Sequence, residues 1–198
     1  DSSITSSSFD DLETLATAIG NSEFSNTTGF TTITVSDAAV DATVLAATID
    51  TYDSINGSGT TLIELSGGAT INVDAEEIVD MLLDETENRL NITDQNIVVT
   101  GSISVDDANL LSATTTGTVT ASITTTETVD SLLNLAGTNA YTIVISSEDA
   151  AVSADDLNTI NALTTEAIDA TAVTDITRDT ISNINTLLTA GNDTAQFT

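Results

Sequence analysis

A short pattern recurs along this chain: an apolar residue, then Ser, Thr or Asp, then three residues, then a second apolar residue. It occurs at Val73-Asp74…Ile78, Val105-Asp106…Leu110, Val152-Ser153…Leu157 and Ile176-Thr177…Ile181, with a weaker copy at Val40-Asp41…Leu45. Each copy is typical of a helix start, because the polar side chain can accept free backbone N–H groups while the two apolar residues pack on each other. The recurrence predicts structural repeats, which usually form surfaces rather than catalytic pockets.

Runs of β-branched residues lie between these helix starts. In residues 118–123 the apolar residues fall on one face and the hydroxyls on the other, as in a half-buried strand. Further strands are predicted at 31–35, 61–65, 97–100, 141–145 and 167–172, and helices at 9–19, 41–51, 75–88, 107–114, 125–135, 154–163 and 178–188. This alternation predicts an α/β fold with solenoid-like repeats of short parallel strands and short helices. A mostly-β sandwich or a β-solenoid is the alternative.

The predicted organisation has two parts. Residues 1–28 form an N-terminal arm and the first helix, and residues 29–198 form the α/β repeat domain. A soft subdivision near 88–96 separates longer repeats from shorter ones. Because the chain begins with Asp1 rather than Met, we expect a processed form or a segment of a longer protein.

The charge of the chain is strongly one-sided. There are 31 Asp and Glu residues against two cations, Arg89 and Arg178, which gives a formal net charge of -29. Such a charge opposes binding to phosphate backbones, so no nucleic-acid partner is expected. No apolar run approaches the ~18 residues of a membrane span, so no membrane insertion is expected. Self-repulsion of this size is relieved by salt, which favours secretion to the cell surface in a saline environment.

Several residue types that support catalysis are absent. The chain has no Lys, His or Cys, which excludes Schiff-base, imidazole and thiol chemistry. A carboxylate-only hydrolase needs none of these, but no Asp-Thr-Gly or Asp-Ser-Gly motif occurs and aromatic residues make up only 3%. The composition therefore predicts a protein that is not an enzyme and requires no cofactor.

Three acid pairs are candidate Ca²⁺ ligands, since Ca²⁺ accepts carboxylate oxygens in flexible geometry. The candidate metal-binding residues are Asp106, Asp107, Glu148, Asp149, Asp155 and Asp156. Helix capping and the helix dipole also favour acids in a first turn, and no EF-hand spacing is present.

The segment 152–174, which opens with Val152-Ser153-Ala154-Asp155-Asp156, carries a Thr-, Ala- and Asp-rich pattern that is also recognisable in 104–120 and is faint before Gly29. It resembles the repeats of very large Thr-, Ala- and Asp-rich surface proteins of bacteria, notably marine cyanobacteria. This resemblance implies secretion, a role at the cell surface and further repetition, and it supplies no catalytic residues.

These observations predict a non-enzymatic extracellular structural protein. Parallel sheets leave an unpaired strand at each edge, and this chain has no Pro to block one. The expected partners are copies of the chain itself, assembled into a filament, sheath or surface layer. The alternative is a Ca²⁺-dependent adhesin or binding module that engages cell-surface glycans.

Overall fold

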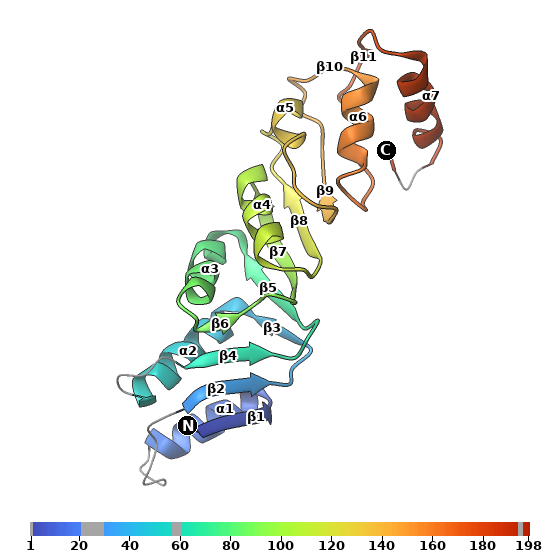
Figure 1. The fold of residues 1–198 in the computed structure, drawn as a ribbon. Coiled ribbons are helices and arrows are strands. Elements are labelled where there is room, and N and C mark those ends of the chain that lie inside the picture. The colour runs from blue at the N-terminus through green and yellow to red at the C-terminus, as the bar shows by residue number, and fades with distance from the viewer. Residues whose placement is uncertain (1, 21–29, 57–60, 194–195) are drawn as a thin grey trace. The chain divides into compact units, whose positions relative to one another are not determined.

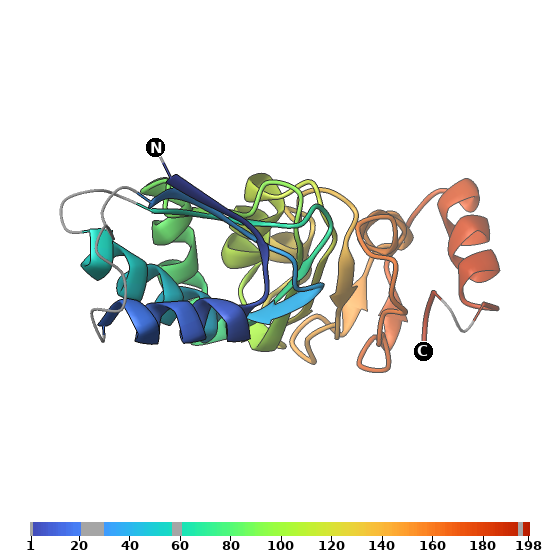
Figure 2. The same cartoon turned by 90° about the horizontal axis from the view of Figure 1, so that it is seen from below.

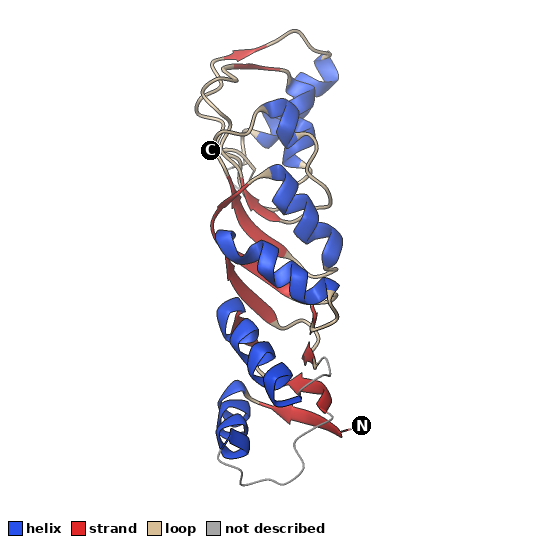
Figure 3. Cartoon of the chain, turned by 90° about the vertical axis from the view of Figure 1, so that its left-hand side faces the viewer, coloured by secondary structure: helices blue, strands red, loops and turns tan. Residues whose placement is uncertain are grey.

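The fold is α/β, with strands and helices in alternation (Figures 1 and 3). A computed structural model describes residues 2–20, 30–56, 61–193 and 196–198. Every strand pairing given for these residues is parallel. The predicted α/β class and parallel strands are therefore confirmed. The chain divides into two compact units, Asp1–Val98 with Thr115–Gly117 (unit 1) and Val99–Thr114 with Thr118–Thr198 (unit 2).

Unit 1 is built on two parallel sheets. One has the strand order β1-β2-β4-β6, and the other contains β3, β5 and the first residues of β7. The strands are β1 (Ser2–Ser7), β2 (Phe30–Val35), β3 (Ala39–Asp41), β4 (Leu62–Leu65), β5 (Thr70–Asp74), β6 (Leu90–Asn91) and β7 (Asn96–Ile103). The helices are α1 (Phe9–Gly20), α2 (Ala42–Asn56), the 3-10 helix η1 (Ala75–Glu77) and α3 (Ile78–Thr86).

Period-2 strands and period-3.6 helices explain the core of unit 1. In β4 and β5 every second residue is buried, as at Ile63, Leu65 and Ile71. From α2, Leu45 and Ile49 are buried four residues apart. The helices α1 and α2 contact each other, as the second view shows (Figure 2).

Unit 2 continues the alternation with shorter elements. Its helices are α4 (Val105–Thr114), α5 (Val129–Leu132), α6 (Ala154–Asn161) and α7 (Ile181–Ala190). Its strands, besides most of β7, are β8 (Val119–Ile123), β9 (Ala140–Thr142), β10 (Ala151–Val152) and β11 (Asp175–Ile176). β8 pairs with β9 and β10 pairs with β11. Residues 167–172 form isolated bridges at Ile168 and Asp169 rather than the predicted strand.

A row of polar side chains lies buried in unit 2. Asn139 Oδ1 accepts the N–H of Val119 at 2.9 Å, and Thr164 Oγ1 accepts the N–H of Tyr141 at 3.0 Å. Both side chains are buried. The Asn139 amide also donates to Ser112 Oγ and to the Tyr141 hydroxyl. Three of these bonds, those to Val119, Ser112 and Thr164, join residues 20 to 27 positions apart, so they tie one strand–helix segment to the next.

The predicted caps are correct at Ser153 and at Asp41, whose Oδ1 accepts the N–H of Thr43. Asp74 precedes η1 as predicted but makes no side-chain cap bond, and the caps at two other places are wrong. Ser153 Oγ accepts the N–H of Asp156 at the start of α6. At α4 the cap is Ser104 rather than Asp106, because Ser104 Oγ accepts the N–H of Asp107. At α7 the cap is Thr180 rather than Thr177, because the N–H of Asn183 donates to Thr180 Oγ1.

The N-terminal residues enter a sheet. Residues 2–7, predicted as part of an arm, form β1, which pairs in parallel with β2. The predicted boundary at 28/29 lies in residues 21–29, outside the described residues. The predicted subdivision at 88–96 lies before the point in β7, between Val98 and Val99, where the two units divide.

Candidate functional site

Two of the predicted metal ligands, Asp107 and Asp156, bind the serine that caps their own helix. Asp107 Oδ2 accepts the Ser104 hydroxyl at 2.7 Å while Ser104 Oγ accepts the N–H of Asp107 at 3.1 Å. Ser153 and Asp156 make the same pair of bonds at 2.6 and 3.0 Å. Each acid thus lies at the capping-box position, three residues after the cap, and accepts the hydroxyl of the cap.

Other carboxylates accept a backbone N–H from the start of the preceding helix. Asp149 Oδ2 accepts the N–H of Val129 at 2.9 Å, and Asp179 Oδ2 accepts the N–H of Asp155 at 2.7 Å. The same arrangement joins Glu127 to Val105 in unit 2 and Asp37 to Phe9 in unit 1. We call these four the cross-segment carboxylates: Asp37, Glu127, Asp149 and Asp179. Free N–H groups and the helix dipole make each helix start a favourable place for such an acid.

The remaining candidate ligands lie elsewhere on the surface. Asp106 and Glu148 are exposed, and Asp155 Oδ1 accepts the Asn183 amide at 3.1 Å. Among the residues that the structure describes, no three His, Cys, Asp or Glu side chains gather as a metal site would require. The six predicted ligands are thus not brought together into one cluster there, and four of them take part in bonds at helix starts.

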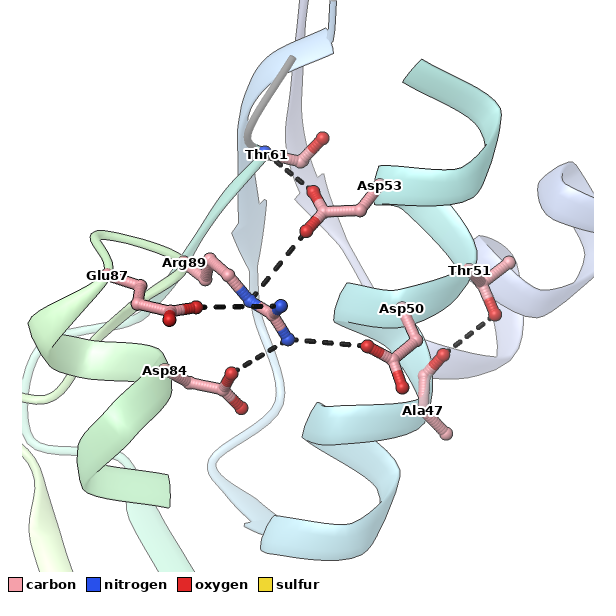
Figure 4. A network of polar contacts seen from close by, with 8 residues as sticks. All are labelled: Ala47, Asp50, Thr51, Asp53, Thr61, Asp84, Glu87 and Arg89. Carbon is pink, nitrogen blue, oxygen red and sulfur yellow. Dashed lines mark hydrogen bonds and ion pairs between the residues drawn. The ribbon is translucent and has the colours of Figure 1, made fainter. Parts of the chain in front are cut away.

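Arg89 lies among four carboxylates in unit 1 (Figure 4). Its guanidinium nitrogens are 2.8 Å from Asp84 Oδ1, 3.3 Å from Asp50 Oδ1, 3.7 Å from Asp53 Oδ2 and 3.8 Å from Glu87 Oε2. We call these five residues the Arg89 cluster. It joins α2, which carries Asp50 and Asp53, to α3 and the turn that follows it. The cluster was missed from the sequence, although one of only two cations stands five residues after Asp84.

Local backbone geometry places Arg89. The residue before it, Asn88, has a φ of 56°, a left-handed conformation that ends α3 and that Asn tolerates. The N–H of Arg89 then donates to the carbonyl of Asp84 at 2.8 Å. Burial raises the pKa of Asp84, while the charge of Arg89 acts in the opposite direction. Asp84 is buried, whereas the Asp50 side chain is 76% exposed, so the Arg89 cluster runs from the interior of unit 1 to its surface and links the two helices through ion pairs.

A groove of about 700 Å³ lies between α1 and α2 in unit 1. Phe9, Leu12, Glu13 and Val44 are among its lining residues, together with Tyr52. The Tyr52 hydroxyl donates to the carbonyl of Leu12 at 2.9 Å, and burial raises the pKa of Tyr52 to about 12. The phenol therefore stays protonated and joins the two helices, and it provides no ionised nucleophile at neutral pH.

Two large apolar side chains of α7 are exposed among polar ones. Ile181 is 79% exposed and Leu188 is 61% exposed, and Ile176 of β11 is exposed as well. In the preceding helices of unit 2 the first residue after the cap is buried, at Val105, Val129 and Ala154. A group of exposed large apolar residues on one segment is typical of an interaction surface.

Comparisons of the chain with models of protein families, with curated proteins and with solved structures find no match. Among the described helices, none is both long enough and apolar enough to cross a bilayer.

Proposed function

We propose that this chain is a non-enzymatic extracellular structural protein whose strand–helix segments stack as the coils of a solenoid-like array. In this proposal, copies of the chain assemble into a filament, sheath or surface layer. The observation that carries the proposal is the set of bonds between consecutive segments. Cross-segment carboxylates, buried Asn139 and Thr164, and the Arg89 cluster all use polar groups to join neighbouring segments.

This use of polar groups supports a scaffold. Asp107 and Asp156 hold helix starts, and Tyr52 and Tyr141 donate to backbone carbonyls at 2.9 and 3.2 Å. These bonds give the groups structural roles at helix starts and between helices. The exposed apolar residues of α7 supply a surface for association.

The charge supports a saline, extracellular setting as part of this proposal. Copies with a net charge of -29 repel each other in dilute buffer. At about 1 M salt the Debye length is ~3 Å, so that repulsion is largely screened while apolar contacts remain.

Electron microscopy and sedimentation velocity of the purified chain test the proposal at low and high salt. We expect polymers at high salt that dissociate on dilution into low salt. Monodisperse monomers at every salt and protein concentration would contradict assembly.

The adhesin alternative makes a different prediction. Asp106 and Glu148 are exposed carboxylates that could contribute to Ca²⁺ binding with a partner surface. Calorimetric titration separates the two functions. Stoichiometric Ca²⁺ uptake with a higher melting temperature would favour the adhesin, whereas indifference to Ca²⁺ and to a chelator would favour assembly alone.

A further inference from the structure

We infer that the groove between α1 and α2 in unit 1 binds an amphiphilic organic cation, in which a primary ammonium group is carried on an apolar chain. This inference goes beyond the proposed function, because it concerns a ligand site within unit 1 and does not depend on the assembly of copies. The groove has a volume of about 700 Å³, within the range of about 300–1,000 Å³ that is typical of small-molecule sites.

The apolar part of the groove comes from both helices. Phe9 and Leu12 lie three residues apart on α1, and Val44 and Ala47 have the same spacing on α2. Residues three positions apart share one face of a helix. Leu12 is buried, whereas Val44 is 45% exposed, so apolar surface remains accessible for a ligand to cover. Removal of such surface from water stabilises a complex.

The hydroxyl groups that line the groove already use their protons within the protein. Five lining residues carry a hydroxyl, and four of these donate to internal acceptors. Thr48 and Thr51 donate to the carbonyls four positions earlier in α2, at 2.8 and 2.7 Å. Thr43 donates to Asp41, and Tyr52 donates to a carbonyl of α1 at 2.9 Å. Because a hydroxyl has one proton, these four groups cannot also donate to a ligand.

The charges around the groove favour a cation. Asp10 and Glu13 are exposed carboxylates on the face of α1 that lines the groove, and none of the described lining residues is a cation. At the starts of the two helices, the N–H groups of Phe9 and Thr43 each donate to a carboxylate at 3.0 Å. These carboxylates take up donors that would otherwise attract an anion to the helix starts.

Together these features select one ligand chemistry. A primary ammonium group has three N–H donors and no acceptor, so it complements carboxylates and hydroxyl lone pairs. An attached apolar chain would cover the exposed surface of Val44. Acids alone do not select the site, because a second hollow in unit 1, between α2 and α3, is also bordered by acids but has a volume of only about 70 Å³. Acids combined with an apolar groove of sufficient size distinguish the α1–α2 site.

Isothermal titration calorimetry of the full chain with decylammonium tests this site. At about 0.15 M salt, and below the concentration at which micelles form, we expect saturable binding of one decylammonium per chain. Decyl sulfate has the same apolar chain with a negative head group and should not bind. Decyltrimethylammonium keeps the positive charge but has no N–H donor, and it should bind at least about threefold more weakly than decylammonium.

The acids are tested by a matched pair of double variants. Asp10→Asn with Glu13→Gln should weaken decylammonium binding by at least about fivefold. Asp106→Asn with Asp130→Asn is the control, because it removes the same number of charges from exposed positions in the first turns of α4 and α5. Since these positions lie in unit 2, the control should leave the binding constant within about twofold of that of the unmodified chain.

The apolar surface is tested by Val44→Thr, which keeps the size and charge of the side chain but replaces a methyl group by a hydroxyl. This variant should weaken decylammonium binding about fourfold. Val79→Thr is its control, because Val79 is also exposed but lies on α3. Circular dichroism checks that each variant folds, and all the substituted side chains are exposed.

The outcomes decide the inference without involving assembly. Absence of saturable binding, or equal effects of the two double variants, would overturn the groove as the site. Equal affinity for decyl sulfate would overturn the cation as its ligand, and equal affinity for decyltrimethylammonium would overturn the role of the N–H donors. Equal effects of Val44→Thr and Val79→Thr would overturn the apolar contact. None of these results bears on the structural function, which sedimentation tests separately.

Discussion

Replacing Asn139 in the buried polar row should destabilise unit 2 strongly. Asn139→Ala removes the acceptor of the Val119 N–H, and Val119 is fully buried. An unpaired buried donor costs about 1–3 kcal/mol. The two bonds donated by the Asn139 amide are lost as well. Their acceptors keep other partners, since Ser112 Oγ donates to Ala136 and the Tyr141 hydroxyl donates to Ala108. These lost bonds add about 1 kcal/mol, for a total loss of roughly 2–4 kcal/mol.

Asn139→Thr is the informative second variant. Thr164 already uses its hydroxyl to accept the N–H of Tyr141 in the same row. A hydroxyl at position 139 can likewise accept the N–H of Val119, so this variant should recover half or more of the loss. Asn134→Ala is the control, because its amide bond to the Asp130 carbonyl is exposed. It should cost under about 0.5 kcal/mol.

The assay is equilibrium denaturation at high salt. The chain has two Tyr residues, Tyr52 in unit 1 and Tyr141 in unit 2. In a Tyr52→Phe background, Tyr fluorescence reports unit 2 alone. The reasoning is refuted if Asn139→Ala costs no more than the control, or if Asn139→Thr is as damaging as Asn139→Ala.

Three further predictions concern unit 1. Gly117→Ala would place its Cβ against the carbonyl oxygen of Gln95, so the backbone must shift, and the midpoint of chemical denaturation should fall by the equivalent of about 1–3 kcal/mol. Gly67→Ala is the comparison, because its Cβ would meet only the end of the Asp94 side chain, at 2.9 Å, which can move; an equal loss there would contradict steric conflict with the backbone as the cause. Arg89→Met leaves Asp84 without its partner at 2.8 Å and should lower the free energy of unfolding by about 1–3 kcal/mol, after allowing for partial solvent screening. Arg178→Met is the control and should leave the free energy of unfolding of the monomer unchanged. Asp84→Asn should alter how the free energy of unfolding depends on pH. Burial raises the pKa of Asp84 above its usual 3.8, so the folded state binds the proton more tightly than the unfolded state does. The unmodified chain should therefore gain stability relative to the variant as the pH falls through that raised pKa. Parallel slopes for the two proteins in acid titrations of the free energy of unfolding would show that Asp84 is not responsible.

The sequence predicted the helix starts best where only one choice of cap was consistent with the pattern. Val152 and Leu157 are both buried on either side of Ser153, as predicted. At α4 two choices were possible, because Ser104 is also followed by an acid three residues later. The structure adopts this earlier choice, which buries Ile103 and Ala108 and leaves Leu110 half exposed. The end of β7 at Ile103 decides between them, and that end depends on tertiary contacts.

Cross-segment contacts explain other differences. At α7 the cap is Thr180 rather than the predicted Thr177. The residue before it, Asp179, accepts the N–H of Asp155, which lies 24 residues earlier. No local pattern carries that information. The strands β3, β10 and β11 have only two or three residues, too few to show alternation, so they were missed. The Arg89 cluster depends on Asp50, 39 residues before Arg89, and was missed for the same reason.

The same contacts explain how a chain with 31 acids and two cations can fold. Ion pairs cannot balance this charge, so backbone N–H groups at helix starts take the place of Lys and Arg. Asp149 and Asp179 bind such groups at 2.9 and 2.7 Å, distances at which salt screens little. Repulsion between exposed acids acts over longer distances and is screened. Salt should therefore remove the repulsion and leave the cross-segment bonds intact. The free energy of unfolding should rise from low to high salt. A fall over that range would show that ion pairs, which salt screens, stabilise the fold instead.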